Sequence, residues 1–351
     1  MNTNNRIVIL HGRVPPDAEP DEQDVLVEAQ QVSEAMISLG YETITLPLSL
    51  DLQEAARRLR ELAPLAVFNL VESIEGEDRL LHLATTLLDY LGIPYTGTGS
   101  EGMFLASNKL LAKRMLVKAG IPTPVWRGAA QVLWGEPGFD PPYLVKSIWD
   151  NASRGLEEVL ESRERLRDHL AVLSAADRLD NVFVESYIEG REFNLSVLQS
   201  GGTAEVLPPA EMLFVDYPTN KPRIVGYAAK WDPASFEYQH TVRRFDFAKE
   251  DRGLLEELCL LARGCWGELA IGGYARVDFR VDNQGRPWVL EVNPNPCLSA
   301  DAGLAAAAAK AGLSYRELVQ RILKPAVETA AAVSLPGGAA FPMAAGGRSG
   351  A

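Results

Sequence analysis

The sequence has few of the residues that build disulfide frameworks or zinc sites. Among its 351 residues there are 3 cysteines and 4 histidines. Cys259, Cys265 and Cys297 show no CxxC spacing and are odd in number, which favours a reduced, cytoplasmic setting over a disulfide-stabilised secreted fold. The histidines are scattered and form no HExxH motif. We therefore expect neither a disulfide framework nor a zinc site.

Long apolar runs and an excess of positive charge are also absent. No run approaches the length of a membrane-spanning helix, and the first residues show no apolar stretch like that of a signal peptide. The chain has 34 Lys and Arg against 47 Asp and Glu, a formal net charge of -13. This balance disfavours nucleic acid and anionic membranes as main partners. The remaining composition is that of a soluble globular protein with two or three domains.

The first 100 or so residues alternate predicted strands with predicted helices. Short apolar runs predict the buried strands, and apolar residues at helical spacing predict the helices between them. The predicted strands are 7–10, 41–46 and 65–70, and the predicted helices are 25–39, 52–62 and 80–91. This order predicts a parallel sheet with helices packed on it.

Ligands of such a sheet bind at the carboxyl ends of its strands, which here are segments 11–24 and 69–78. The second segment is acidic, with Glu72 and Asp78 among its residues. It is either a solvated loop or, if it faces a cleft, a site for a substrate ammonium group.

The run Gly97–Gly102 formally matches the dinucleotide motif GxGxxG. A dinucleotide site requires an acidic residue about 20 positions later, but residues 103–135 contain no Asp or Glu. We therefore predict a tight turn that leads into the next helix, and we exclude NAD.

Two alternating runs around a turn predict a β-hairpin at residues 273–296. If the hairpin is symmetric about its turn, Asp278 lies opposite Glu291, and Arg276 lies opposite Asn293. Two facing carboxylates repel each other and require a cation between them. Carboxylate and amide oxygens are the ligands that Mg²⁺ takes, and an arginine beside the metal can stabilise developing negative charge. The apolar residues of the other parity are expected to point to the opposite face of the hairpin: Ala275, Val277, Phe279, Val281, Leu290 and Val292.

At this hairpin the sequence resembles a known family. Arg276-Val-Asp278-Phe and Leu290-Glu291-Val-Asn293-Pro resemble the metal-binding hairpin of ATP-grasp enzymes, and most closely that of the D-alanine–D-alanine ligase branch. Further matches follow in family order through about residues 5–325. The resemblance implies an α/β ATP-grasp fold, in which an N-terminal parallel α/β domain precedes two α+β subdomains that enclose ATP. It also implies that Asp278, Glu291 and Asn293 bind the metal and that Arg276 is catalytic.

The resemblance assigns further residues to ATP. Lys109, Lys146 and Lys230 take the places of the lysines that contact phosphate, and the remaining assignments to ATP are Glu185, Ile188 and Glu192. The other basic residues of the helix predicted from residue 109, among them Lys113, are interpreted as a solvated face. A loop after Lys146 corresponds to the one that covers the triphosphate, and we assign its Ser153 to catalysis.

The substrate end departs from the family pattern. Where D-alanine ligases have a glycine and, five residues later, a serine, this chain has Cys297 and Ala302, with Asp301 before the latter. Glu72 replaces a histidine. The remaining substrate candidates are Asp24 and Trp231, while Arg243 stays unassigned. Cys297 is interpreted as a small filler at a tight turn. An acceptor amine without a carboxylate, or a different acid, suits Asp301 and Ala302 better than a second D-alanine.

The predicted activity is ATP-dependent joining of a carboxylate to an amine through an acyl phosphate. The implied cofactors are ATP and magnesium, two ions per site, with manganese as the alternative metal. We expect small-molecule substrates, no nucleic acid, no membrane, and a homodimer as the candidate assembly. Three alternatives stay open: a genuine D-alanine–D-alanine ligase that binds the second carboxylate through another group such as Arg243, an ATP-grasp enzyme with a thiol or hydroxyl acceptor, and a non-catalytic nucleotide-binding regulatory module.

Four segments are predicted along the chain. Residues 1–102 form the N-terminal substrate domain and 103–184 the central ATP-grasp subdomain with the phosphate-covering loop. Residues 185–325 form the C-terminal subdomain with the metal and catalytic residues. Residues 326–351, rich in Ala, Gly and Pro, are predicted to be a disordered tail outside the fold.

Overall fold

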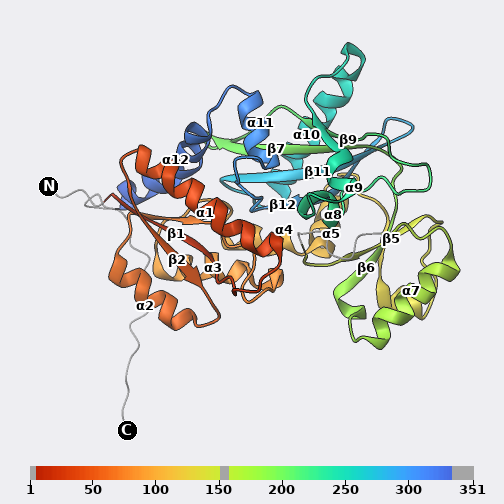
Figure 1. Cartoon of the computed structure of the whole chain (residues 1–351), viewed down its shortest axis with the longest axis horizontal. Coiled ribbons are helices and arrows are strands. Elements are labelled where there is room, and N and C mark those ends of the chain that lie inside the picture. Colours follow the sequence, from red (N-terminus) through yellow and green to blue (C-terminus); the bar gives the residue numbers. More distant parts are fainter. Residues whose placement is uncertain (1–4, 151–157, 334–351) are drawn as a thin grey trace, which may run out of the picture.

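The computed structural model describes residues 5–150 and 158–333. Its N-terminal part is a parallel sheet of three strands in the order β2-β1-β3. Strands β1 and β2 are labelled in Figure 1. The strands are β1 (Arg6–Gly12), β2 (Glu42–Leu48) and β3 (Ala66–Asn69), and the helices are α1 (Pro20–Ser38), α2 (Leu52–Leu62) and α3 (His82–Leu91). The predicted parallel α/β arrangement is confirmed.

Both faces of this sheet are covered, which explains why its strands are continuous apolar runs. On one face, Ile7 and Ile9 of β1 pack in a core that includes α1. On the other face, Val8 and Leu10 pack in a core that includes α2 and α3. The carboxyl ends of β1 and β3 therefore open at a common edge, as the sequence predicts.

Helix α1 begins at Pro20, five residues before the predicted start at Val25. Pro20 fits the first turn because its missing N–H is not needed there, and Glu19 and Glu22 form a capping box. The sequence prediction followed apolar periodicity alone, which begins later. The earlier start places Asp21 and Asp24 on the first turns of the helix, beside the edge of the parallel sheet.

The glycines of segment 97–102 serve close packing. Gly97 has φ +91, a conformation that favours glycine. A Cβ atom on Gly273 would lie 2.5 Å from the Cα atom of Gly97, so the two backbones meet without side chains between them. A Cβ on Gly102 would lie 2.3 Å from the carbonyl oxygen of Ala270. Helix α4 (Ser100–Ser107) follows at once, so the predicted turn into a helix is confirmed. Helix α5 (Lys109–Lys118) comes next.

The central part is a three-stranded sheet in the order β4-β6-β5. Its strands are antiparallel, and two helices pack against it. The elements are β4 (Trp126–Gly128), α6 (Ala129–Leu133), β5 (Tyr143–Ser147), α7 (Arg163–Ala175) and β6 (Val182–Ser186). Ser153, which follows β5 in the sequence, lies outside the described residues.

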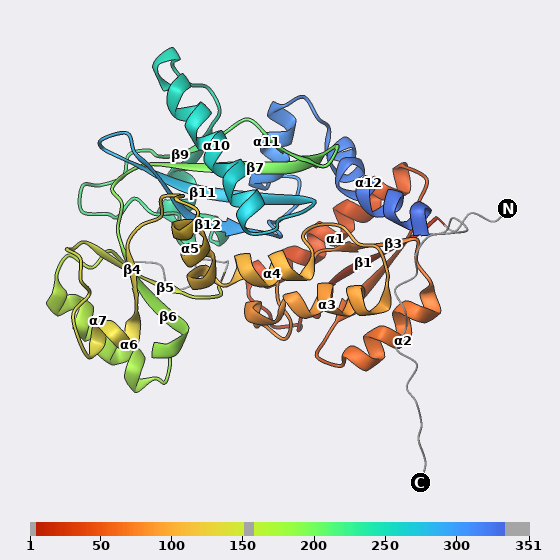
Figure 2. The same ribbon diagram turned by 180° about the vertical axis from the view of Figure 1, so that it is seen from behind.

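The C-terminal sheet has six strands, in the order β10-β9-β7-β11-β12 with β8 paired to β7. They are β7 (Gly190–Ser200), β8 (Thr203–Val206), β9 (Ala210–Phe214), β10 (Thr241–Arg244), β11 (Tyr274–Asp282) and β12 (Pro287–Asn293). Helix α10 (Arg252–Glu268) and α5 cover its apolar face, which is in front in Figure 2. The short helices α8 (Tyr227–Trp231) and α9 (Phe236–His240) lie between β9 and β10 in the chain.

The hairpin of β11 and β12 has the predicted register at its functional end. Asp278 pairs with Glu291, and Arg276 pairs with Asn293. The register then shifts, so that Phe279 pairs with Val289 and Leu290 is left as an extra residue. The prediction that Leu290 points to the face opposite Glu291 is therefore wrong, since both line the large cavity. The bulge turns this side chain into the cleft, where it lines the large cavity.

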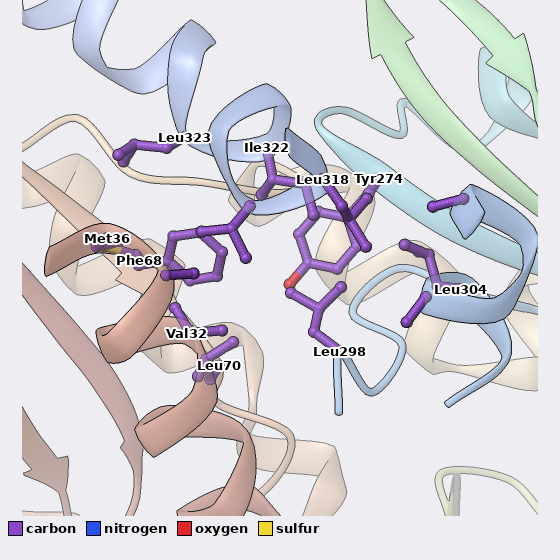
Figure 3. Close-up of a cluster of buried hydrophobic side chains, with 14 of the residues drawn as sticks. Val32, Met36, Phe68, Leu70, Tyr274, Leu298, Leu304, Leu318, Ile322 and Leu323 are labelled. Carbon is purple, nitrogen blue, oxygen red and sulfur yellow. The ribbon is translucent and has the colours of Figure 1, made fainter. Parts of the chain in front are cut away.

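Two C-terminal helices return to the N-terminal sheet. Helix α11 (Gly303–Lys310) and α12 (Tyr315–Val333) pack with α1, β3 and Tyr274 of β11 in one core (Figure 3). The predicted tail begins too early, because α12 continues to Val333 and buries Ala326 and Ala330. Small residues suit this close helix packing, whereas the sequence prediction interpreted them as a lack of core formers. Residues 334–351 lie outside the described residues.

Candidate active site

A cavity of about 480 Å³ lies between the central sheet and the polar face of the C-terminal sheet. The central sheet contributes Lys146 and Glu185, and the C-terminal sheet contributes Glu192, Arg276 and Asp278. The predicted ATP residues are thus brought together in one space. The other predicted residues that line it are Lys109, Ile188, Lys230, Glu291, Asp24, Trp231, Cys297, Asp301 and Ala302.

The polar face of the C-terminal sheet is built by strand parity. Arg276, Asp278 and Arg280 alternate along β11 with core residues. Arg276 donates from Nε and Nη2 to the two carboxylate oxygens of Asp278, at 2.8 and 2.9 Å. Asn194 of β7 donates to the same carboxylate at 2.8 Å. Arg280 forms an ion pair with Glu192 at 2.8 Å, so both acids are oriented by fixed neighbours.

Glu291 is the most positively surrounded acid of the site. Lys109 Nζ lies 3.5 Å from its Oε2 atom, and the same lysine donates to the carbonyl of Asp150 at 2.5 Å. Burial alone would raise the pKa of Glu291, but Lys109, Lys146, Lys230 and Arg276 hold it well below the usual range. These four cations therefore favour the ionised form of Glu291.

Glu185 is buried between two lysines, of which the sequence analysis identified one. Lys146 Nζ lies 3.4 Å from Glu185, and Lys113 forms a second ion pair with it. Lys113 Nζ also donates to Thr123 Oγ1 at 2.6 Å. The interpretation of Lys113 as part of a solvated helix face is wrong, because its side chain is 2% exposed. Its position on α5, four residues after Lys109, places both lysines on the face that meets the cleft.

The donor set for a metal consists of Asp278, Glu291 and Asn293. The two carboxylates sit on directly paired strand positions, and these hard oxygen ligands fit magnesium. The described residues contain no cluster of three or more His, Cys, Asp and Glu side chains that could hold a metal. Asn293 Oδ1 accepts a hydrogen bond from the backbone of Asn295 at 3.0 Å. The metal assignment stays a prediction, supported by the chemistry of these donors.

A second cavity of about 100 Å³ adjoins the first at the carboxyl ends of β1 and β3. Lys230, Trp231, Arg276 and Cys297 line both spaces. The acids of the smaller cavity come from α1 and from the loop after β3, and they are Asp21, Glu22, Glu72 and Asp78. Asn293 lines this cavity as well. The acidic loop is therefore part of a cleft.

Glu72 is the perturbed acid of this small cavity. Burial, followed by the charges of Asp78 and Asp24, raises its pKa to about 8, although Arg276 acts in the opposite direction. The cavity is lined by four acids and by the cations Arg13, Lys230 and Arg276. A positively charged group beside Glu72 would favour the ionised form of this carboxyl group.

Cys297 has a polar role in addition to filling a turn. Its Sγ atom donates to Asp24 Oδ2 at 3.1 Å, and the Ser299 hydroxyl donates to the same oxygen at 3.1 Å. Burial, with Glu28, Glu72 and Asp24, raises the pKa of this thiol well above its usual value. The group is therefore a hydrogen-bond donor that helps to orient Asp24, and is unsuited to act as a thiolate nucleophile.

Sequence reasoning assigned no role to two residues that line the large cavity, Asn194 and Arg280. The parity of β7 carried a signal for one of them, since Asn194 follows Glu192 by two positions. The strand pairing then places Asn194 beside Asp278 and Glu192 beside Arg280. That pairing joins strands more than 80 residues apart and is absent from local sequence patterns.

Comparison with known proteins identifies the family. The family model described as "D-ala D-ala ligase C-terminus" matches residues 134–324. A D-alanine–D-alanine ligase from Gloeobacter violaceus is 31% identical over 329 residues, which are 91% of this chain and 98% of that protein. One from Pseudomonas entomophila is 32% identical over 330 residues, 92% and 94% of the two chains. The chain belongs to the D-alanine–D-alanine ligase family.

Solved structures agree on the fold. The crystal structure of a D-alanine–D-alanine ligase from Bacillus anthracis complexed with ATP has a TM-score of 0.69 and 21% identity, covering 93% of this chain and 98% of that one. As a member of this family, the protein is an ATP-grasp enzyme, and it is a ligase that forms carbon–nitrogen bonds. No helix in the described ranges is long and apolar enough to span a membrane.

Proposed function

We propose that the protein activates a carboxylate with ATP and joins it to an amine, and that its substrate pair differs from two D-alanines. The observation that carries this proposal is the two-cavity site. One end presents Lys109, Lys146 and Lys230, which suit a triphosphate. The other end presents Glu72 and Cys297 where other members of the family have a histidine and a glycine.

The first half of the reaction requires neutralised charge and alignment. In it, a carboxylate oxygen attacks the γ-phosphorus of ATP, ADP leaves, and an acyl phosphate forms. The three lysines would neutralise phosphate oxygens, and Asn194 and Arg276 hold the Asp278 carboxylate in place. Magnesium bound by Asp278, Glu291 and Asn293 would supply the positive charge that offsets the triphosphate.

The second half requires stabilisation of an oxyanion. The amine attacks the acyl carbon, the amine loses a proton, and phosphate leaves with the oxygen that came from the acid. Arg276 would take this role, and its position in the lining of both cavities supports the assignment. The acids of the small cavity, Glu72 foremost, would hold an ammonium group on the first substrate.

A second candidate is D-alanine–D-alanine ligase itself. Relatives that are 31% and 32% identical carry that name. A ligase with another substrate pair and a D-alanine–D-alanine ligase differ in the substrates that bind in the small cavity and beside Ala302.

Phosphate release with a panel of amino acids and amines tests the proposal. We expect amine-dependent release, with mass spectrometry showing an amide other than D-alanyl-D-alanine as the preferred product. If D-alanine alone gives the highest kcat/KM, the second candidate is correct. If ATP binds and no panel member increases phosphate release, the chain is a non-catalytic nucleotide-binding module.

A further inference from the structure

Arg280 is a cation in the wall of the large cavity that the proposed chemistry does not use. It is 3% exposed, and a buried guanidinium group requires partners for its charge and its N–H groups. One partner is Glu192, with which it forms an ion pair at 2.8 Å. Glu192 is itself 6% exposed. The cleft therefore contains a charge pair that is largely removed from water.

The strand register places this pair on the side of the metal donors away from the small cavity. Arg280 of β11 lies directly opposite Glu192 of β7. Arg276 lines both cavities, whereas of these two cavities Asp278 and Arg280 line only the large one. Arg280 is two residues beyond Asp278 on the same face of β11, a rise of about 6–7 Å. With phosphates at the proposed metal donors, the pair lies on the side to which the nucleoside would extend.

The same guanidinium group also holds two segments of backbone. Its Nη1 atom donates to the carbonyl of Gly190 at 3.2 Å, and its Nη2 atom donates to the carbonyl of Arg223. Gly190 is the first residue of β7, and Arg223 lies between β9 and α8. Helix α8 carries Lys230. One side chain thus joins Glu192, the start of β7 and the segment that leads to a proposed phosphate ligand.

Two aromatic rings restrict the position of this group further. The guanidinium carbon lies 5.6 Å from the ring centre of Tyr187 and 5.5 Å from that of Phe214, distances at which a cation is attracted to a ring. A planar guanidinium group has five N–H donors in a fixed arrangement, so it can serve a carboxylate and two carbonyls at once. A lysine ammonium group lacks this planar arrangement.

Arg280 favours the form of Glu192 that accepts hydrogen bonds. Burial raises the pKa of Glu192, and Asp278 adds to this effect, while Arg280 and Lys230 act in the opposite direction. The ion pair occupies the Oε2 atom of Glu192, and this side chain lines the large cavity. A carboxylate accepts hydrogen bonds and donates none, so the matching group of a nucleotide is a hydroxyl. Ribose carries two neighbouring hydroxyl groups, and deoxyribose lacks one of them.

We propose that Arg280 is a positioning residue that determines the selection of ribonucleotides. It fixes the Glu192 carboxylate, and with it the segment at Arg223, so that the cleft binds a nucleotide with both ribose hydroxyls more tightly than a deoxynucleotide. Arg280 acts through Glu192. This inference rests on the proposed use of ATP in this cleft, and it does not depend on which acid and amine are joined.

The test compares nucleotides that differ by one hydroxyl group. Isothermal titration calorimetry with Mg²⁺, in the absence of acid and amine, measures the Kd of ATP, 2′-deoxy-ATP and 3′-deoxy-ATP. The variants are R280M, which keeps an apolar side chain of similar length, and R280K, which keeps the charge. The control is R286M, on the turn of the same hairpin, where the Arg286 side chain is 61% exposed. Circular dichroism verifies that each variant is folded.

We expect the wild-type protein to bind ATP about 10- to 100-fold more tightly than at least one deoxynucleotide. R280M should reduce this preference to less than about 3-fold, R280K should reduce it by at least about 3-fold, and R286M should leave it unchanged. If R280M fails to fold, R280K alone decides.

A purely structural role of Arg280 predicts a different result, because it would weaken all three nucleotides equally. An unchanged preference in the folded variants, or no preference in the wild-type protein, would overturn the inference. Loss of all nucleotide binding in both folded variants would show a general structural role and would overturn it as well. If the wild-type protein does not bind ATP, the proposed function fails, and the inference fails with it.

Discussion

At the residue scale, the site is a balance of buried charges. Glu291 is surrounded by four cations, and Glu185 by two lysines. Removing one partner of such a buried pair leaves an uncompensated charge, which costs more than the pair itself contributes. Each acid therefore contributes to the shape of the site as well as to its chemistry.

Replacing Glu291 by Gln tests the metal assignment. The isosteric amide removes one negative charge from the four cations and one proposed magnesium ligand. We expect kcat to fall more than about 100-fold, because the variant removes a proposed metal ligand itself and not a residue that only orients such a ligand. Circular dichroism should show an unchanged fold, and Glu256→Gln on the exposed face of α10 serves as the control. Near-normal turnover by the Glu291 variant would remove the metal assignment.

The raised pKa of Glu72 predicts a pH dependence. Below about pH 8 this carboxyl group is largely protonated, and above that pH it is ionised. The KM of a substrate that carries an ammonium group should fall as the pH rises from about 6.5 to 8.5. Burial is the largest cause of this shift, and the charged groups that act on it are Asp78, Asp24, Arg276 and Asp21.

Glu72→Gln should flatten this profile, since an amide does not titrate in that range. Steady-state kinetics at several pH values, with buffers of constant ionic strength, measures the effect. A KM profile that is equally steep in the variant would show that another group titrates.

The face to which a single side chain points was predictable where the alternation of residues along a strand alone determines it. The facing of Asp278 and Glu291 follows from a symmetric hairpin, and the structure confirms it. The orientation of Arg243 and the burial of Lys113 were not predictable, for different reasons. The orientation of Arg243 depends on pairing with β9, and the burial of Lys113 depends on Glu185, which lies on a distant strand. Local patterns do not encode such long-range partners.

At the element scale, the ends of helices and strands shape the cleft. The bulge at Leu290 turns this side chain, which was expected on the opposite face, toward the nucleotide end. Helix α8 is tied to α1 by a hydrogen bond from Tyr227 to Asp21 at 3.0 Å. Element types were predictable from apolar periodicity and glycine positions. The bulge and the true ends of α1 and α12 were not, because tertiary packing sets them.

The extended α12 predicts a stability difference between two truncated chains. A chain that ends at Lys324 loses the buried methyl groups of Ala326 and Ala330, together with the partly buried Val327. It should be less stable than a chain that ends at Val333 by at least about 2 kcal/mol. Urea denaturation of the two chains measures the difference, and equal stability would contradict the packing of this last segment.

At the scale of the whole molecule, one core joins the two ends of the chain. Leu318 of α12, Phe68 of β3 and Tyr274 of β11 belong to the same buried cluster (Figure 3). The fold class was predictable because the order of motifs spans most of the chain. This shared core was not predictable, since it forms between segments more than 200 residues apart. The predicted boundaries between the first three segments stay a prediction.

Leu318→Ala tests this shared core. Leu318 is 0% exposed, so the substitution should lower the free energy of unfolding by about 2–5 kcal/mol. Leu260→Ala is the matched control, because Leu260 is 66% exposed and its loss should cost less than about 0.5 kcal/mol. Similar losses for both variants in chemical denaturation would contradict the proposed core.

The central claim is that the carboxylate itself attacks ATP in this cleft. Once the product assay identifies the acid, it is labelled with ¹⁸O in its carboxylate and turned over with ATP and the amine. Mass spectrometry of the released phosphate gives the answer. One ¹⁸O atom transferred to each phosphate is the predicted result, and unlabelled phosphate formed alongside the amide would contradict it.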